Sequence, residues 1–149
     1  MKMIAISFTA VALLTGCAAG TVKDLKSDPA NSIRVEINQN YQRVYKNLLE
    51  KMQECMGEGW VGAFAQNHIR HAMFNELQEA NISYVMSNLG HQNHYLHVDI
   101  KGYEHEKTKL EAFVYFSTWR PALGRVEAWA RDANTACDVA PPQPVAADK

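Results

Sequence analysis

Two neighbouring stretches, residues 95–101 and 109–117, alternate apolar and polar side chains, and this pattern constrains the fold more than any other. An alternation with a period of two is typical of β-strands that bury one face. The polar residues 102–108 between them predict a turn, so we expect an antiparallel hairpin. Its inward residues are Leu96, Val98, Ile100, Leu110, Ala112, Val114 and Phe116, and its outward residues are His97, Asp99, Lys101, Glu111, Phe113 and Tyr115.

A helix is expected well before this hairpin. The apolar residues from Tyr41 to Cys55 recur at intervals of three or four positions, as they do along one side of a helix. Asn38 or Asn40 is a suitable residue to cap its start, and Gly57 predicts its end. A stripe of this composition is typical of a helix that packs on a protein core.

The remaining segments complete the expected fold. Shorter strands are expected in three further places, residues 33–37, 60–65 and 82–86. Residues 68–77 fit either a strand or a short helix, and a second helix begins near Pro121 and carries its apolar side as far as Cys137. This order predicts an α+β fold, with an antiparallel sheet of about four strands and two helices packed on one face and joined by a disulfide.

The chain begins with a pattern of another kind. Lys2 supplies one positive charge, and the eleven residues 4–14 that follow are apolar except for Ser7 and Thr9. A membrane-spanning helix needs roughly 20 apolar residues. The apolar region of a secretory signal peptide has roughly 7–15. The pattern therefore predicts a signal peptide and not a buried helix.

The sequence Leu14-Thr15-Gly16-Cys17 ends this apolar run. It resembles the lipobox of bacterial lipoproteins, which has an aliphatic residue, a small residue, Gly or Ala, and then Cys. The resemblance implies that Cys17 is linked to diacylglycerol, that cleavage removes residues 1–16, and that fatty acids such as palmitate anchor the protein. Two or three acyl chains hold a protein stably on a membrane, whereas a single chain holds it only marginally.

The residue after the lipobox bears on location. Ala18 stands where the inner-membrane retention signal of this family has Asp, so the resemblance implies the outer membrane with the domain facing the periplasm. The mature chain is expected to have a lipidated tether at residues 17–31, one α+β domain at residues 32–137 and a disordered tail at residues 138–149. Its layout also resembles small Gram-negative envelope lipoproteins without an assigned function.

The chain has three cysteines, and two remain for the folded domain if Cys17 carries lipid. Because an exported protein occupies an oxidising compartment, Cys55 and Cys137 are expected to form a disulfide. The alternative is a reactive cysteine nucleophile, which needs a nearby histidine and a setting that favours the thiolate.

Histidines are the best candidates for metal ligands. His91, His94 and His97 follow one another at intervals of three, but strand alternation predicts that His94 and His97 face opposite sides of the sheet. A zinc site typically needs three or four converging ligands. We therefore expect neither a metal nor another cofactor, and keep His97 with Asp99 only as a weak metal-binding or partner-binding surface.

The outward aromatic residues Phe113 and Tyr115 allow two interpretations. Exposed aromatic side chains on a sheet can mark a surface that binds a partner. The same two residues can instead lie under the second helix or a loop, because alternation does not say which faces of a sheet are covered.

Composition and motifs limit the function. The 15 Lys and Arg balance 16 Asp and Glu without a basic cluster, which argues against nucleic-acid binding. No GxSxG, HExxH or Gly-rich phosphate loop occurs, so we do not expect an enzyme. We expect a lipid-anchored cell-envelope protein with a structural role or with an envelope protein, lipid or cell-wall partner. The alternative is a periplasmic lipoprotein that binds a metal or small ligand through its His-rich hairpin.

Overall fold

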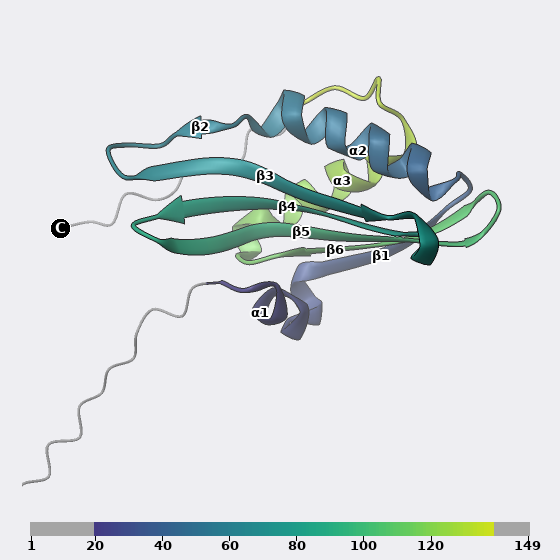
Figure 1. Cartoon of the computed structure of the whole chain (residues 1–149), viewed down its shortest axis with the longest axis horizontal. Helices are drawn as coiled ribbons and strands as arrows, with labels where there is room; N and C mark the ends of the chain where they lie inside the picture. Colours follow the sequence, from purple (N-terminus) through teal and green to yellow (C-terminus); the bar gives the residue numbers. More distant parts are fainter. Residues whose placement is uncertain (1–19, 139–149) are drawn as a thin grey trace, which may run out of the picture.

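A single six-stranded sheet organises the structure, a computed structural model that describes residues 20–138. All neighbouring strands are antiparallel, in the order β1-β6-β5-β4-β3-β2 (Figure 1). The strands are β1 (Ser32–Ile37), β2 (Gly59–Trp60), β3 (Ala65–Phe74), β4 (Glu79–Asn88), β5 (His91–Glu104) and β6 (Lys107–Val114). The helices are α1 (Val22–Ser27), α2 (Tyr41–Met56) and α3 (Arg120–Arg131), with short 3-10 turns at Pro29–Asn31, Asn75–Leu77 and Ser117–Trp119.

The predicted count of about four strands and two helices is wrong, because the described residues form six strands and three α-helices. Residues 68–77, which fitted either state, belong mostly to β3. The strand expected at residues 60–65 is reduced to the two residues of β2, because the chain turns at Gly62 with φ +89°. The β5–β6 turn is also tighter than expected, since Glu104 already pairs with Lys107.

The helices α2 and α3 cover one face of the sheet together (Figure 1). Asn40 caps α2 by accepting a hydrogen bond from the amide of Gln42 at 2.9 Å, and Gly57, with φ +67°, ends it. This start and this end agree with the sequence pattern. The buried residues of the helices and the sheet form one core, which includes Val44, Leu48, Met52, Ile82, Leu96, Val98, Ile100, Leu110, Ala112, Val114, Val126 and Trp129.

The end of α3 differs from the prediction. The helix stops at Arg131 because Asp132 has extended backbone angles, φ −147° and ψ 118°. Cys137 therefore lies in an irregular segment after the helix and not on its apolar side. This segment, residues 132–138, returns along the helices toward the end of α2.

The third helix, α1, lies on the opposite face of the sheet, within the segment that the sequence assigned to a tether (Figure 1). A reciprocal capping box starts it, in which Thr21 and Asp24 each accept a hydrogen bond from the other's backbone amide. Leu25 is almost completely buried, and α1 contacts β5 and β6. The folded domain thus includes residues before Ser32. Residues 1–19, with the signal peptide and Cys17, and residues 139–149 of the expected tail lie outside the described residues.

Burial of Leu25 is expected to hold α1 on the sheet, since a helix of six residues is too short to be stable alone. Leu25→Ala should lower the free energy of unfolding by about 2–4 kcal/mol through lost burial and the cavity left behind. Urea denaturation followed by circular dichroism measures this loss. The matched variant Lys23→Ala, at an exposed position of the same helix, should change stability by less than about 0.5 kcal/mol. Equal effects of the two variants would contradict the assigned packing.

Candidate functional site

A row of hydrogen-bonded polar side chains crosses the sheet face that carries α1. Ser83 on β4 lies directly opposite His97 on β5 in the strand register, and Ser83 Oγ is 2.7 Å from His97 Nδ1. His97 Nε2 is 3.0 Å from Asp99 Oδ1, two residues further along β5. The other carboxylate oxygen of Asp99, Oδ2, forms an ion pair with the ammonium group of Lys26 on α1 at 2.5 Å. The row therefore connects the sheet to the helix that covers it.

The charge on Asp99 determines the direction of these hydrogen bonds. Burial alone raises the pKa of Asp99, but the hydrogen bonds from His97 and Lys26 outweigh it, and the pKa lies below its ordinary value. The ionised carboxylate only accepts hydrogen bonds, so Nε2 of His97 carries a proton. When the imidazole is neutral, Nδ1 is an acceptor and the hydroxyl of Ser83 donates to it.

A Ser–His–Asp hydrolase has the same three groups in the same order, but its serine meets Nε2 and its carboxylate meets Nδ1, so the two ring nitrogens of His97 are exchanged here. A nucleophile must also meet its substrate, and here both reacting groups are covered. Ser83 is 4% exposed and His97 5% exposed, and α1 packs on β5, the strand that carries His97. In this conformation the row is suited to holding α1 in place and not to attacking a substrate.

The expected surface site at His97 and Asp99 is therefore wrong in its placement, since His97 is buried and Asp99 pairs with Lys26. Phe113 lies opposite His97 on β6 and is also buried, with the ammonium of Lys26 5.7 Å from its ring centroid. Tyr115 remains partly exposed at the end of the same sheet edge. Lys26 of α1 lies over Phe113, whereas Gly20, in the stretch before α1, lies against the ring of Tyr115.

A β-bulge changes the position of His94. The register of β4 and β5 shifts between Tyr84 and Val85, so that His94 pairs with Val85. Directly paired residues share a face, and Val85 shares its face with Ser83, two residues away. His94 therefore lies on the same face as His97, and the predicted opposite placement is wrong. Burial lowers the pKa of His94, and electrostatic interactions with His97, Arg70 and His68 lower it further.

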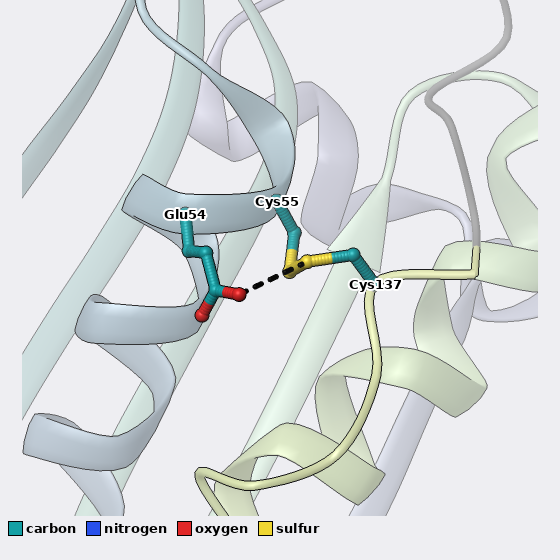
Figure 2. A group of neighbouring side chains, drawn as sticks. All are labelled: Glu54, Cys55 and Cys137. Atoms are coloured by element: carbon teal, nitrogen blue, oxygen red, sulfur yellow. Dashed lines mark hydrogen bonds between the residues drawn. A yellow bond between two sulfur atoms is a disulfide. The ribbon is translucent and has the colours of Figure 1, made fainter.

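The second cluster surrounds a disulfide. Cys55, near the end of α2, is joined to Cys137, with 5.2 Å between their Cα atoms, which confirms the predicted pair (Figure 2). Glu54 Oε1 approaches Cys137 Sγ at 3.8 Å. Within the described residues, Glu54, Cys55 and Cys137 are the only trio of potential ligands whose donor atoms lie close together. Because both sulfurs are oxidised, they are not the thiolates that bind zinc.

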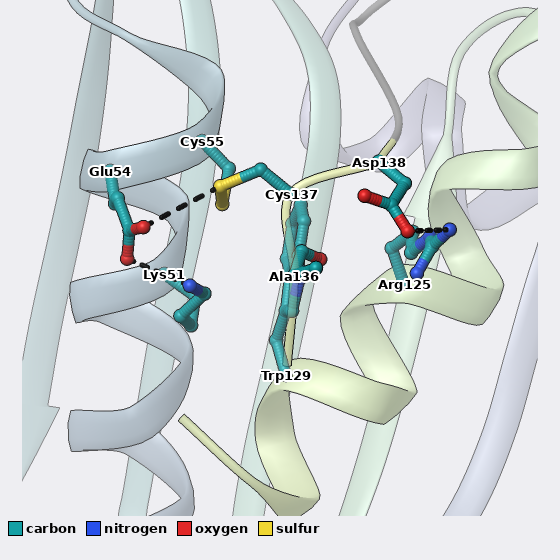
Figure 3. Close-up of a disulfide and its surroundings, with 8 residues drawn as sticks. All are labelled: Lys51, Glu54, Cys55, Arg125, Trp129, Ala136, Cys137 and Asp138. Atoms are coloured by element: carbon teal, nitrogen blue, oxygen red, sulfur yellow. Dashed lines mark hydrogen bonds and ion pairs between the residues drawn. A yellow bond between two sulfur atoms is a disulfide. The ribbon is translucent and has the colours of Figure 1, made fainter. Parts of the chain in front are cut away.

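Neighbouring contacts fix the segment that carries Cys137 (Figure 3). The indole of Trp129 donates to the carbonyl of Ala136 at 3.2 Å. The buried Lys51 pairs with Glu54 at 2.7 Å, and Arg125 reaches Asp138 at 3.5 Å. The surroundings of the disulfide are thus those of a structural link between α2 and the end of the domain.

Comparison with known proteins identifies no family for this chain. No protein-family model matches the chain, and no curated protein matches it. Among the described residues, no helix is both long enough and apolar enough to cross a membrane.

Sequence reasoning missed two members of the polar row, Ser83 and Lys26. The register that brings Ser83 to His97 joins residues that are 14 positions apart, and the bulge lies between the paired segments. Lys26 belongs to the segment assigned to a tether, which has no periodic pattern. Only His97 and Asp99, which are two residues apart and therefore share one face of a strand, indicated the position of the polar row.

The ion pair of Asp99 is expected to make stability depend on pH. A carboxyl group whose pKa is lowered by folding stabilises the protein above its unfolded pKa of about 3.9, and this contribution disappears as the pH falls through the folded value. Asp99→Asn should therefore lower stability at pH 6 by up to about 1 kcal/mol, a modest figure because solvent screens a carboxylate that is 36% exposed.

The difference between wild type and Asp99→Asn should shrink below about pH 4, as followed by urea denaturation at a series of pH values. Glu76→Gln, at an exposed position of the β3–β4 turn, is the control for a change of charge alone. A difference that stays constant down to pH 2 would argue against the ion pair.

Removing the disulfide should destabilise the domain strongly. The link closes a loop with a sequence separation of 82, for which chain entropy predicts about 4 kcal/mol of stabilisation. The double variant Cys55→Ala/Cys137→Ala avoids a free thiol, and its thermal unfolding should match that of reduced wild type. Glu54→Gln keeps the disulfide and should melt near the oxidised wild type. Mapping of envelope-derived protein that found both thiols free would refute the link.

Proposed function

We propose that this protein is a lipid-anchored component of the bacterial cell envelope with a non-catalytic structural or partner-binding role. The observation that carries the proposal is the Leu14-Thr15-Gly16-Cys17 motif directly after an apolar run of signal-peptide length. The absence of Asp at position 18 favours the outer membrane, with the domain on the periplasmic side.

The beginning of the domain supports this proposal. Only Ala18 and Ala19 separate Cys17 from Gly20, the first described residue. The carbonyl of Gly20 accepts a hydrogen bond from the amide of His94 on β5 at 2.8 Å. A lipid on Cys17 would therefore be attached almost directly to the sheet, which favours a protein that works at the membrane surface.

The disulfide and the buried polar row support the same class of protein. A disulfide between Cys55 and Cys137 is consistent with an oxidising compartment, as the periplasm is. The hydroxyl of Ser83 and the imidazole of His97, which together have the chemistry for nucleophilic catalysis, both belong to residues that are buried. This arrangement favours a binding or structural role over hydrolysis.

Replacing the lipid-bearing cysteine tests the proposal. Cys17→Ser should accumulate as an unprocessed precursor that takes up no labelled palmitate, whereas wild type should begin at a lipid-modified Cys17. Mass spectrometry of both proteins from envelope fractions measures this. A wild-type protein that retains Met1, or that carries an unmodified Cys17, would refute lipidation.

A matched variant tests the location separately. Ala18→Asp introduces the inner-membrane retention signal of lipoproteins while it leaves the lipobox intact. We expect this variant to be lipidated normally and to move from the outer-membrane to the inner-membrane fraction in a density gradient. Lipidated wild type in the inner-membrane fraction would contradict the proposed location but not the anchor.

A further inference from the structure

Two turns at one end of the sheet present large apolar side chains to solvent. Trp60, the last residue of β2, and Phe64, in the β2–β3 turn, are 72% and 68% exposed. The β4–β5 turn carries Leu89, which is 75% exposed. The register brings the two turns together, since Ala65 after the first pairs with Asn88 before the second. Both turns lie at the left end of the sheet in Figure 1. These three residues are called the apolar tip below.

The conformation of Leu89 is unfavourable for a leucine. Its φ is +45°, in the left-handed region, and Gly90 after it has φ +85°. A two-residue hairpin turn of this type favours Asn followed by Gly, because Asn adopts the left-handed region more readily than leucine does. Neither folding nor solubility explains an exposed leucine at this position, which points to a function for its side chain.

The chain enters the fold at the same end. Gly20 pairs with the first part of β5, where its amide donates to Asn93 Oδ1 at 3.2 Å and its carbonyl accepts from His94. It occupies the edge of β5 just beyond Tyr115, whose amide bonds to Tyr95. A Cβ atom at Gly20 would lie 2.8 Å from the ring of Tyr115, so the close approach requires glycine.

The short connection limits where a lipid on Cys17 can be. Three residues of extended chain span at most about 11 Å, so the anchor stays within that distance of Gly20. The strand β5 has 14 residues and runs from this end to the other, a length of about 45 Å. The lipid therefore lies near the apolar tip and cannot reach the far end of the sheet.

Charge is distributed unequally between the two ends. The segments that form or flank the anchored end, residues 59–69, 80–98 and 112–119, contain no Asp, Glu, Lys or Arg. The guanidinium of Arg70 is the charged group that reaches this end, where it donates to Gln92 at 2.6 Å. The far end carries Glu76 and Glu79 in and after the β3–β4 turn and Glu104, Glu106 and Lys107 around the β5–β6 turn. Entry into a bilayer interface costs least where no charge must lose water, and Trp is enriched at this depth.

We infer that the apolar tip docks on the bilayer that holds the lipid anchor, with Trp60, Phe64 and Leu89 inserted among the lipid headgroups. The inference rests on the proposed lipidation of Cys17. The occupant is a lipid surface because the anchor would hold this end beside one and because the two turns themselves carry no Asp, Glu, Lys or Arg for a protein partner to match. The exposed Phe74 and Leu77 lie at the far end beside Glu76 and Glu79 and are not part of this surface.

Trp60 is a natural reporter of docking. The chain has three tryptophans, and Trp119 and Trp129 are both buried in the core. Mature lipidated protein is reconstituted into phosphatidylethanolamine–phosphatidylglycerol vesicles that contain lipids with brominated acyl chains, which quench nearby indoles. We expect most of the Trp60 emission to be lost, and the quenchable part of the signal to be absent in Trp60→Phe.

Two variants separate docking from folding. Phe64→Ser/Leu89→Asn should keep or raise the melting temperature, because Asn suits the turn, yet it should lose the quenching of Trp60 and expose it to aqueous acrylamide. Leu77→Ser removes an equally apolar side chain at the far end and should leave the quenching unchanged. Equal loss of quenching in both variants would overturn the inference.

The outcomes distinguish this inference from the proposed function. Protein that floats with the vesicles while Trp60 stays accessible to acrylamide would overturn docking and leave the anchor intact. Protein that does not float and has no lipid on Cys17 by mass spectrometry would overturn both. If Trp60 is protected in native envelopes but not in pure lipid vesicles, a protein partner covers the tip and the lipid assignment is wrong.

Discussion

The packing of α1 against the sheet is the constraint on which the rest of this structure depends. The middle strands β4 and β5 bury side chains on both faces, with Ile82 and Leu96 under α2 and α3 and with Ser83, Val85 and His97 on the other side. A two-layer arrangement would leave the second group in water. The short α1, with Leu25 as its apolar contact and Lys26 as its polar contact, supplies cover on this side over β5 and β6.

This cover also explains why a polar row can exist inside the domain. A buried imidazole is costly unless both ring nitrogens have partners, and His97 finds them in Ser83 and Asp99. Asp99 in turn is compensated by Lys26, so the last partner of the row comes from α1. The row therefore makes the docking of α1 specific in position, whereas an apolar contact alone would tolerate sliding.

The sequence predicted the parts of the fold that have a local periodic signal. The stripe of α2, its Asn40 cap and the alternation of β5 and β6 lie within single segments, so they were found at nearly the right positions. The helix α1 spans six residues, fewer than two turns, and buries only Leu25, so it leaves no period to detect. The face of His94 was misassigned because a bulge at Tyr84 and Val85 shifts the alternation, and a bulge depends on the pairing of two strands.

The same distinction applies to the candidate site, where one part could be predicted from the sequence and another depends on how the strands pair. The disulfide between Cys55 and Cys137 was predicted from the expected oxidising compartment and from the number of cysteines, without knowledge of their positions in space. The row of Ser83, His97 and Asp99 depends on strand register, which residues 14 positions apart do not reveal in their own patterns. The position of Cys137 was missed for a related reason: α3 ends at Arg131 without Gly or Pro, and the segment that follows is held by tertiary contacts such as that of Trp129 with Ala136.

The apolar tip and a lipid anchor on Cys17 would reinforce each other energetically. Free association with a membrane must repay the lost translational and rotational freedom before any burial of side chains yields net affinity. A lipid on Cys17 would already meet that cost, so insertion of three side chains would only have to orient the domain, as in any tethered second contact. Because α1 begins within a few residues of Cys17 and Lys26 pairs with Asp99 of the sheet, an anchor on Cys17 would have little freedom to move relative to the sheet. The charged far end, with Glu104, Glu106 and Lys107, would then point away from the lipid into the aqueous compartment.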